Sequence, residues 1–426
     1  MIIIYIKYLF SDKNFKLISQ IIFVVSFLFI INNEKIYIKS NEDLKAIKIR
    51  KLIIKLNVFA KHRKPQYILF SDFFGSKYCS DINAYTLFEY YLNNNIDEVY
   101  YIINGESELY YTLEKENKIG NLIIYNKSEI IFDKLFNYLL NSKIIIQSYV
   151  LLDFQYIINN VTYLKYLYIN HGITYFKNNF VAPELIYLNE DKRNIITSSP
   201  YEYNIFVNKF NYSNKYIYKA GIARYDTYKT IQLDKSEKDC ILISFTYRSY
   251  NSLYYEKSLY KKNIIKLLNQ NSLIDFLKKK NIDLIYIPHH NELFLQKNYN
   301  QTNFQYAKIK GQKDLTKYIK KCSLLITDFS SISFAFMFQL KPILFYLIDF
   351  NDTINVAEKK YMDPNNELYF GKAFISQNTL IKQIKYYVNI RFRIDSNLKK
   401  KYKNVFYFRN NICKRISKII NFVIQK

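Results

Sequence analysis

The chain has 426 residues, and its 62 Lys and Arg against 36 Asp and Glu give a net charge of +26. This chain is longer than one ordinary hydrophobic core accommodates, so two domains of roughly 150 to 200 residues are expected. The positive charge favours an anionic partner, which is nucleic acid, an anionic membrane or a phosphate-rich substrate. AT-rich coding also produces this excess of Lys, Ile, Asn and Tyr, so charge alone does not choose among them.

The four cysteines, Cys79, Cys240, Cys322 and Cys413, are far apart and form no CxxC pair. Neither a zinc site nor a disulfide framework is indicated, and a reducing compartment is expected.

Residues 17–32 contain one apolar run, about half of the roughly 20 residues that span a bilayer. No small-residue cleavage site follows, so a membrane-lying or weakly inserted helix is favoured over secretion. A buried element of the first domain is the alternative. Residues 45–64 alternate basic and apolar side chains, as interfacial helices do on anionic lipid. We therefore expect residues 1–62 to form a membrane-associated helical segment.

From Gln66 onward, short apolar runs alternate with longer amphipathic stretches, which predicts an α/β fold with parallel sheets. Strands are expected at residues 67–71, 99–103, 122–125, 143–147, 166–170 and 194–197, and then at 241–245, 283–288, 324–327 and 343–349. A long helix is expected at 263–280. A polar break at 232–239 divides the series into domains 63–234 and 235–426, the second with a basic, partly helical tail.

The motifs GxGxxG, GxxxxGK[ST] and DxD do not occur. Their absence argues against a dinucleotide-binding oxidoreductase, a P-loop NTPase and a metal held by paired carboxylates.

The stretch LLITDFSSISFAF predicts a buried strand followed by a helix that begins at Ser330 or Ser331 and ends before Lys341. Ligands bind at the carboxyl edge of parallel sheets, where this turn lies. A helix N-terminus with two hydroxyls suits a phosphate. Plain N-capping by the serines explains the pattern equally well.

Histidines follow two other expected strands. His171 precedes Gly172 after one strand, and His289 with His290 follows another. An imidazole at such a position can act as a general base or donate to a phosphate oxygen. The fourth histidine, His62 in KHRK, is interpreted as a solvated basic residue.

Two further strand exits carry arginine. Arg224 and Asp226 follow the run YIYKAG, and Thr246 and Arg248 follow the strand at 241–245. Arginine there can clamp a phosphate in bidentate fashion, although Arg224 and Asp226 can also pair with each other to fix a hinge.

The ordered motifs GSKYCSDINA, INHGITYFK, GIARYDTY, ISFTYR, PHH, ITDFSSISFAF and KPILFYLID resemble the CDP-glycerol glycerophosphotransferases of teichoic-acid and capsule assembly. The resemblance covers about residues 66–375. It implies a GT-B fold, in which two Rossmann-like domains face each other across a cleft: an acceptor domain at 63–234 and a nucleotide-donor domain at 235–426.

The resemblance also implies roles. His171 would be the catalytic base and His289 would steady the donor pyrophosphate. Gly172, Arg224 and Asp226 would shape the cleft. The expected donor and phosphate site consists of Thr246, Arg248, Thr327, Asp328, Ser330 and Ser331.

By this resemblance a hydroxyl of a lipid-linked or polymeric acceptor attacks the β-phosphorus of CDP-glycerol or a related CDP-alditol, and CMP leaves. The reaction would take place at the cytoplasmic face of the membrane. The motifs require no cofactor or metal, although Mg²⁺ is compatible with them. Ala335 stands where the family often has an acidic residue, and His290 where it has proline, which leaves the donor and the inward-facing histidine open.

Two alternatives remain. A GT-B glycosyltransferase that uses a nucleotide sugar would need the same kinds of residue. A non-catalytic basic protein that binds nucleic acid or membrane is disfavoured, because Tyr and Lys are scattered rather than gathered in RNA-binding motifs, and no nucleic-acid partner is expected.

Overall fold

The computed structural model describes residues 41–72, 82–125, 132–149, 152–176, 188–229, 238–248, 258–289, 306–311, 314–352, 361–370 and 373–426. The chain divides into two compact units, Met1–Lys51 and Leu52–Lys426. The strands among these described residues all belong to the second unit, and they form two parallel sheets.

The first sheet has seven parallel strands in the order β3-β2-β1-β4-β5-β6-β7. Its strands are β1 (Tyr67–Ser71), β2 (Glu98–Asn104), β3 (Leu122–Tyr125), β4 (Ser142–Gln147), β5 (Tyr166–Tyr168), β6 (Ile195–Thr197) and β7 (Ile217–Lys219). The strand order reverses between β1 and β4. In doubly wound sheets the carboxyl edge at such a reversal is the usual ligand-binding position.

The second sheet repeats this plan with six parallel strands in the order β10-β9-β8-β11-β12-β13, which reverses between β8 and β11. Its strands are β8 (Cys240–Ile243), β9 (Asp283–Tyr286), β10 (Lys308–Ile309), β11 (Leu324–Thr327), β12 (Ile343–Tyr346) and β13 (Ala373–Phe374). The predicted α/β fold with two Rossmann-like sheets is therefore confirmed. The predicted boundary near residue 235 lies outside the described residues.

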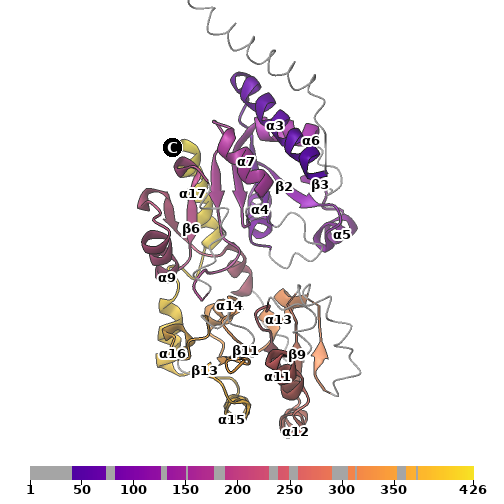
Figure 1. Ribbon diagram of the computed structural model, residues 1–426, viewed down its shortest axis with the longest axis vertical. Helices are drawn as coiled ribbons and strands as arrows, with labels where there is room; N and C mark the ends of the chain where they lie inside the picture. Colours follow the sequence, from indigo (N-terminus) through magenta and orange to yellow (C-terminus); the bar gives the residue numbers. More distant parts are fainter. Residues whose placement is uncertain are drawn as a thin grey trace, which may run out of the picture. The chain divides into compact units, whose positions relative to one another are not determined.

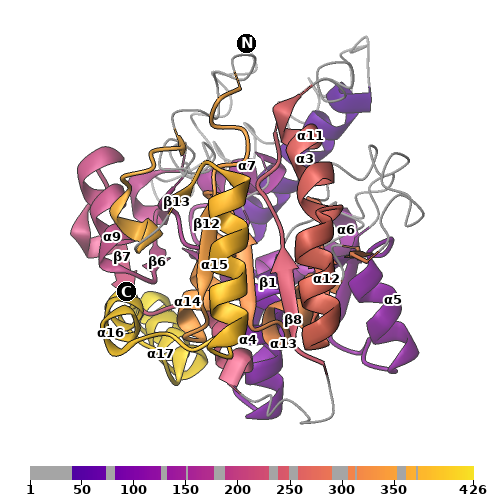
Figure 2. The same cartoon turned by 90° about the horizontal axis from the view of Figure 1, so that it is seen from below.

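Helices connect the strands (Figure 1). The α-helices are α3 (Asn41–Phe59), α4 (Asn83–Asn93), α5 (Glu108–Lys115), α6 (Phe132–Leu140), α7 (Leu152–Asn160), α9 (Pro200–Asn204), α11 (Leu259–Leu268), α12 (Asn271–Lys280), α13 (Leu315–Lys321), α14 (Ile332–Phe338), α15 (Gln377–Asn389), α16 (Ser396–Asn404) and α17 (Ile412–Gln425). Helices α12 and α15 lie beside each other on one face of the second sheet (Figure 2), where Leu277 and Ile384 share a core with strand residues.

All ten apolar runs that predict strands form strands, because a parallel strand covered on both faces needs an unbroken apolar run. The expected helix at 263–280 is instead two helices, α11 and α12, interrupted at Asn269 and Gln270. The two-residue strands β10 and β13 have no sequence signal.

The apolar run at 17–32 lies outside the described residues. In the part of the chain that the structure describes, no helix is long and apolar enough to cross a bilayer. Helix α3 differs from the expected interfacial helix, because Leu52, Ile53 and Leu56 are buried within the protein. These three side chains are therefore used for packing, whereas Val58 and Phe59, at the end of the helix, are exposed.

The last helix, α17, packs on the first sheet although its sequence follows the second. Ile416 and Ile420 share a core with Ile144 and Ile146 of β4. A Cβ at Gly221, just after β7, would lie 3.1 Å from Ile412, so glycine allows this close approach. The first sheet thus obtains part of its cover from residues assigned by sequence to the second domain.

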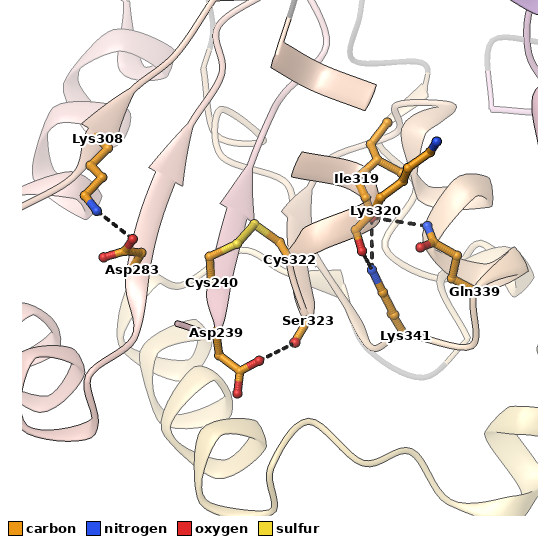
Figure 3. Close-up of a disulfide and its surroundings, with 10 residues drawn as sticks. All are labelled: Asp239, Cys240, Asp283, Lys308, Ile319, Lys320, Cys322, Ser323, Gln339 and Lys341. Carbon is orange, nitrogen blue, oxygen red and sulfur yellow. Dashed lines mark hydrogen bonds and ion pairs between the residues drawn. A yellow bond between two sulfur atoms is a disulfide. The ribbon is translucent and has the colours of Figure 1, made fainter. Parts of the chain in front are cut away.

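A disulfide joins Cys240 and Cys322, contrary to the expectation of unpaired thiols (Figure 3). Strands β8 and β11 are neighbours, with Ile241 opposite Leu324. Cys240 lies one residue before Ile241 and Cys322 two residues before Leu324, and their Cα atoms are 4.5 Å apart. The pairing was invisible in the sequence because 82 residues separate the two cysteines. The expectation of no disulfide was wrong for this reason.

Lys341 lies close to this disulfide and closes the end of α13 (Figure 3). Its Nζ donates to the carbonyl oxygens of Ile319, at 3.0 Å, and Lys320, at 2.6 Å. Burial lowers the pKa of Lys341 to about 7. The Lys of the KPILFY motif thus binds the last carbonyl oxygens of α13, at the amino edge of the sheet.

Reduction of the Cys240–Cys322 disulfide should destabilise the protein by about 2–4 kcal/mol, because the bond restrains a long loop of the unfolded chain. Urea unfolding with and without dithiothreitol measures the change. The double variant Cys240→Ala with Cys322→Ala should not respond to reductant. The prediction would be contradicted if the wild-type protein were equally stable with and without dithiothreitol, or if a non-reducing peptide map lacked this cross-link.

Candidate active site

A buried polar network occupies the carboxyl edge of the second sheet, at the reversal between β8 and β11. Asp328 follows β11 and accepts hydrogen bonds from the Thr246 backbone N, at 3.0 Å, and from Thr246 Oγ1, at 2.9 Å. Arg248 Nη1 lies 2.8 Å from Asp328 Oδ2. These bonds tie the segment after β8 to the segment after β11.

Arg248 continues the network to β12. Its Nε and Nη2 donate to the two oxygens of Asp349, at 2.7 and 2.8 Å, and Nη1 also donates to the Thr246 carbonyl. The Arg248 side chain has no exposed surface. Burial alone would lower the pKa of Arg248, but the Asp349 and Asp328 carboxylates raise it well above its ordinary value. The guanidinium that was expected to clamp phosphate is enclosed among carboxylates.

Thr327 is enclosed in the same way. Its Oγ1 donates to the Ser244 carbonyl at 2.6 Å, and both Thr327 and Asp328 are fully buried. The expectation that these two side chains and Arg248 face a ligand is therefore not met by their geometry. Their polar atoms bond to the protein and hold the strand ends together.

Ser330 and Ser331 differ from this buried group. Ser331 is exposed at the first position before α14, and its side chain makes no capping hydrogen bond to the helix. The backbone carbonyls of Ser330 and Ser331 begin the helix instead, accepting from the amides of Ser333 and Phe334. Plain N-capping, the alternative explanation for this serine pair, does not describe Ser331.

The loop after β5 brings His171 to the first sheet's carboxyl edge. His171 is exposed, and its ring lies 5.8 Å from the ring of Tyr149. A Cβ at Gly172 would lie 3.2 Å from Ser331 Oγ, so glycine allows this close approach. The histidine loop of the first sheet therefore meets the serine turn of the second.

His289 follows β9 and stacks on Tyr247, with ring centroids 5.6 Å apart and an interplanar angle of 30°. Tyr247 lies between Thr246 and Arg248, so His289 borders the buried network. His290 lies outside the described residues.

Arg224 and Asp226 lie in the turn after β7. The Arg224 backbone N donates to Asn83 Oδ1 at 3.1 Å, and Asp226 Oδ2 accepts from Cys413 N, at the start of α17, at 2.8 Å. Asp226 therefore caps α17 and fastens that helix to the turn between the two sheets.

At the strand reversal of the first sheet, the N-terminus of the following helix, α4, is occupied by a side chain of the protein. Asp72, at the end of β1, accepts from the backbone amides of Ala84 and Tyr85 at the start of α4, at 2.8 and 2.9 Å. Tyr101 and Ser148 also donate to this carboxylate. A side-chain anion thus occupies the helix N-terminus at this reversal.

Four buried polar residues of these edges, Asp72, Asn83, Glu202 and Asp349, were missed by sequence reasoning. Asp349 carried a usable signal, because it follows an apolar strand in KPILFYLID. Asn83 and Glu202 lie within helical stretches, and only the fold shows their partners.

Among the residues that the structure describes, no three His, Cys, Asp or Glu side chains are grouped to hold a metal ion. A cavity of about 490 Å³ lies elsewhere, beside Arg193 and Tyr216. These residues precede β6 and β7, so the cavity is at the amino edge, away from the predicted site residues.

Comparison with known families decides the relationship. The sequence profile of the family described as CDP-Glycerol:Poly(glycerophosphate) glycerophosphotransferase matches residues 53–424. The chain belongs to this family. The predicted resemblance to the CDP-glycerol glycerophosphotransferases is confirmed, and the family match covers both sheets.

Two curated Bacillus subtilis relatives of this chain are each 26% identical. One, the minor teichoic acid biosynthesis protein GgaB, matches over 260 residues, which are 56% of this chain and 28% of that protein. The other, a teichoic acid glycerol-phosphate primase, matches over 193 residues, which are 42% of this chain and 46% of that protein. The matches therefore span less than half the length of these curated relatives.

Solved structures show the same fold. The wall teichoic acid polymerase TagF has a TM-score of 0.65 and 16% identity, over 96% of this chain and 98% of that one. A putative UDP-N-acetylglucosamine 2-epimerase from Listeria monocytogenes has a TM-score of 0.53 at 11% identity, over 83% of this chain and 95% of that one. Because the second protein is described as an epimerase, the shared architecture does not by itself fix the reaction.

Proposed function

We propose that this glycerophosphotransferase-family chain transfers glycerol phosphate, or a related alditol phosphate, from a CDP-alditol to an acceptor hydroxyl in teichoic-acid-like or capsular polymer synthesis. The observation that carries the proposal is the meeting of the His171 loop with the serine turn before α14, in a chain whose family match includes both. The acceptor is proposed to be a lipid-linked or polymeric alcohol.

His171 is the proposed general base. It is exposed at the carboxyl edge of the first sheet, and the adjacent Gly172 lies against Ser331. The acceptor O–H proton passes to the imidazole as the oxygen bonds to the donor β-phosphorus. The bond from this phosphorus to the bridging oxygen breaks, and CMP leaves.

Ser330 and Ser331 are the proposed phosphate ligands. The Ser331 hydroxyl makes no capping bond, so it can donate to a phosphoryl oxygen as negative charge develops there. His289, stacked on Tyr247, would lie on the pyrophosphate side. Thr246, Thr327, Asp328 and Arg248 serve this site by holding the turn in place, because their polar atoms bond within the protein.

The difference between the two edges supports the choice of the second sheet for the nucleotide. Asp72 places a carboxylate at the α4 N-terminus of the first sheet, where it would repel a donor phosphate. The turn before α14 carries hydroxyls instead. The first sheet is therefore the proposed acceptor side.

Purified protein incubated with a lipid-linked glycerol phosphate acceptor should release CMP from CDP-glycerol or CDP-ribitol. UDP-glucose and GDP-mannose should yield no nucleoside diphosphate. The readout is the released nucleotide, measured by anion-exchange chromatography. Release should be equal with and without EDTA, because the proposed chemistry needs no bound cofactor. Release of UDP or GDP without CMP would favour the glycosyltransferase alternative.

The variant His171→Ala should lower CMP release by roughly a hundredfold or more, because the acceptor loses its base, while CDP affinity changes less than about twofold. The double variant Ser330→Ala with Ser331→Ala should instead weaken CDP binding. Calorimetry of CDP binding with parallel rate measurements separates the two. Loss of CDP affinity in the His171 variant would overturn the assignment of the base.

Arg248→Met should destabilise the protein by about 3–5 kcal/mol, since it leaves the buried Asp328 and Asp349 without a counter-charge. Urea unfolding gives the value, and Arg393→Met, at an exposed position, is the control. A change below about 1 kcal/mol would show that the network does not need this charge.

We also propose peripheral attachment to the cytoplasmic face of the membrane. The exposed Lys48, Arg50 and Lys51 of α3 support this, because each basic residue near an anionic surface adds about 1 kcal/mol. Changing these three residues to Gln should halve or further reduce co-flotation with phosphatidylglycerol vesicles. The control is the same change at Lys399, Lys400 and Lys401, which are exposed in the second domain. Equal flotation of both variants would contradict the role of α3.

A further inference from the structure

A buried hydrogen-bond network lies directly beneath the His171 loop. Asn170 Oδ1 accepts from the His171 backbone N at 2.8 Å. Asn170 Nδ2 donates to Glu202 Oε1 at 2.6 Å and to Thr174 Oγ1 at 3.2 Å. Thr174 N also donates to Glu202 Oε1, at 3.0 Å. The loop is therefore bonded to Glu202 on both sides of His171.

Asn170 needs this support because its backbone is left-handed, with φ of 50°. Only Gly, and to a lesser extent Asn and Asp, adopts this region readily. The conformation turns the chain out of β5 and places His171 at the sheet edge. A second bond fixes the same turn from α4, since Asn83 Nδ2 donates to the Asn170 carbonyl at 2.6 Å.

Glu202 looks at first like an ordinary helix cap. Ser199 begins α9 and accepts from the Glu202 backbone N at 3.0 Å, and S-x-x-E is the capping-box pattern. In a capping box the Glu side chain accepts from the backbone N–H of the N-cap residue, which here is Ser199. Instead, Oε2 accepts from the N–H of the preceding residue, Ser198, at 2.7 Å, and Oε1 faces the His171 loop. The capping box therefore does not explain the contact between Oε1 and this loop.

The environment of Glu202 makes this contact strong. The side chain is fully buried, and three N–H groups donate to it: those of Asn170, Thr174 and Ser198. Burial raises the pKa of Glu202 to about 7, while the three donated bonds lower it in part. Hydrogen bonds to a charged acceptor are stronger than neutral ones, so an ionised Glu202 restrains Asn170 firmly.

We propose that Glu202 is a positioning residue for the transfer reaction, which holds His171 in place through the side chain of Asn170. This inference rests on the proposed role of His171 as base. Glu202 does not touch the substrate. It fixes the peptide that carries the imidazole, and a small displacement of a reacting group is enough to slow a reaction strongly.

The first test uses Glu202→Gln, which keeps the size of the side chain but turns an amide N–H₂ toward groups that are themselves donors. The rate constant kcat for CMP release from CDP-glycerol should fall roughly tenfold to a hundredfold. The KM for CDP-glycerol and the affinity for CDP should change less than about twofold, because the donor site is on the other sheet. The matched control is Ser107→Ala, which removes a buried helix cap of the same domain and should leave kcat unchanged.

A second variant, on the other side of the same hydrogen bond, provides a test if Glu202→Gln does not fold. Asn170→Gly retains the left-handed backbone but removes the side chain that links Glu202 to His171. It should lower kcat to a similar degree, and the double variant should be no worse than either single variant. An unchanged kcat in folded Asn170→Gly overturns the proposal. A double variant in which the kcat losses of the two single variants multiply overturns it as well.

Histidine-selective ¹³C labelling gives a readout that does not depend on turnover, because the chain has only four histidines. The His171 signal, assigned with His171→Gln, should shift and broaden in Glu202→Gln and Asn170→Gly, while the His62 signal does not. An unchanged His171 signal overturns the positioning role. If the His171 signal shifts in the two variants but the wild-type protein releases no CMP, the positioning role stands and the proposed function is refuted instead.

Discussion

A buried positive charge fixes the carboxyl edge of the second sheet. Arg248 has no exposed side-chain surface, and a guanidinium removed from water is tolerated only beside carboxylates that neutralise it. Asp328 and Asp349 supply these charges from the ends of β11 and β12, and Arg248 itself follows β8. One charge cluster thus sets the spacing of three neighbouring strand ends. The serine turn before α14 is held by this cluster.

The two sheets share one strand order but differ in what lies at the reversal. In the first sheet, a carboxylate from β1 bonds to the amides that open α4. In the second, the exposed Ser331 stands before α14 without capping it. Two similar scaffolds therefore carry different side chains at these helix N-termini, a carboxylate in the first and hydroxyls in the second. This difference in side chains rather than topology separates an alcohol-binding edge from a phosphate-binding one in the proposed reaction.

The sequence predicted the central strands well and their polar partners poorly. Buried parallel strands such as β1, β3 and β11 are continuous apolar runs bounded by polar residues, so their positions follow from local pattern. An arginine at a strand exit has the same local pattern whether it faces a ligand or a carboxylate, and Arg248 was placed wrongly toward the ligand for that reason.

Contacts between distant residues were beyond reach of local pattern. The Cys240–Cys322 bond and the contact between Asn170 and Glu202 depend on which strands become neighbours. The serine turn and the histidine loop were found because residue type and strand exit coincide in each. Their meeting at Gly172 required the folded chain.

The return of α17 to the first sheet imposes an order on folding. Ile144 and Ile146 precede the second sheet in the sequence, but Ile416 and Ile420, which share their core, follow it. During synthesis, N-terminal domains generally fold first. Here the first domain cannot complete its core until α17, which follows the second sheet in the sequence, has been synthesised, so the two become native together. A nascent chain stalled before α17 would expose an uncovered apolar face to chaperones.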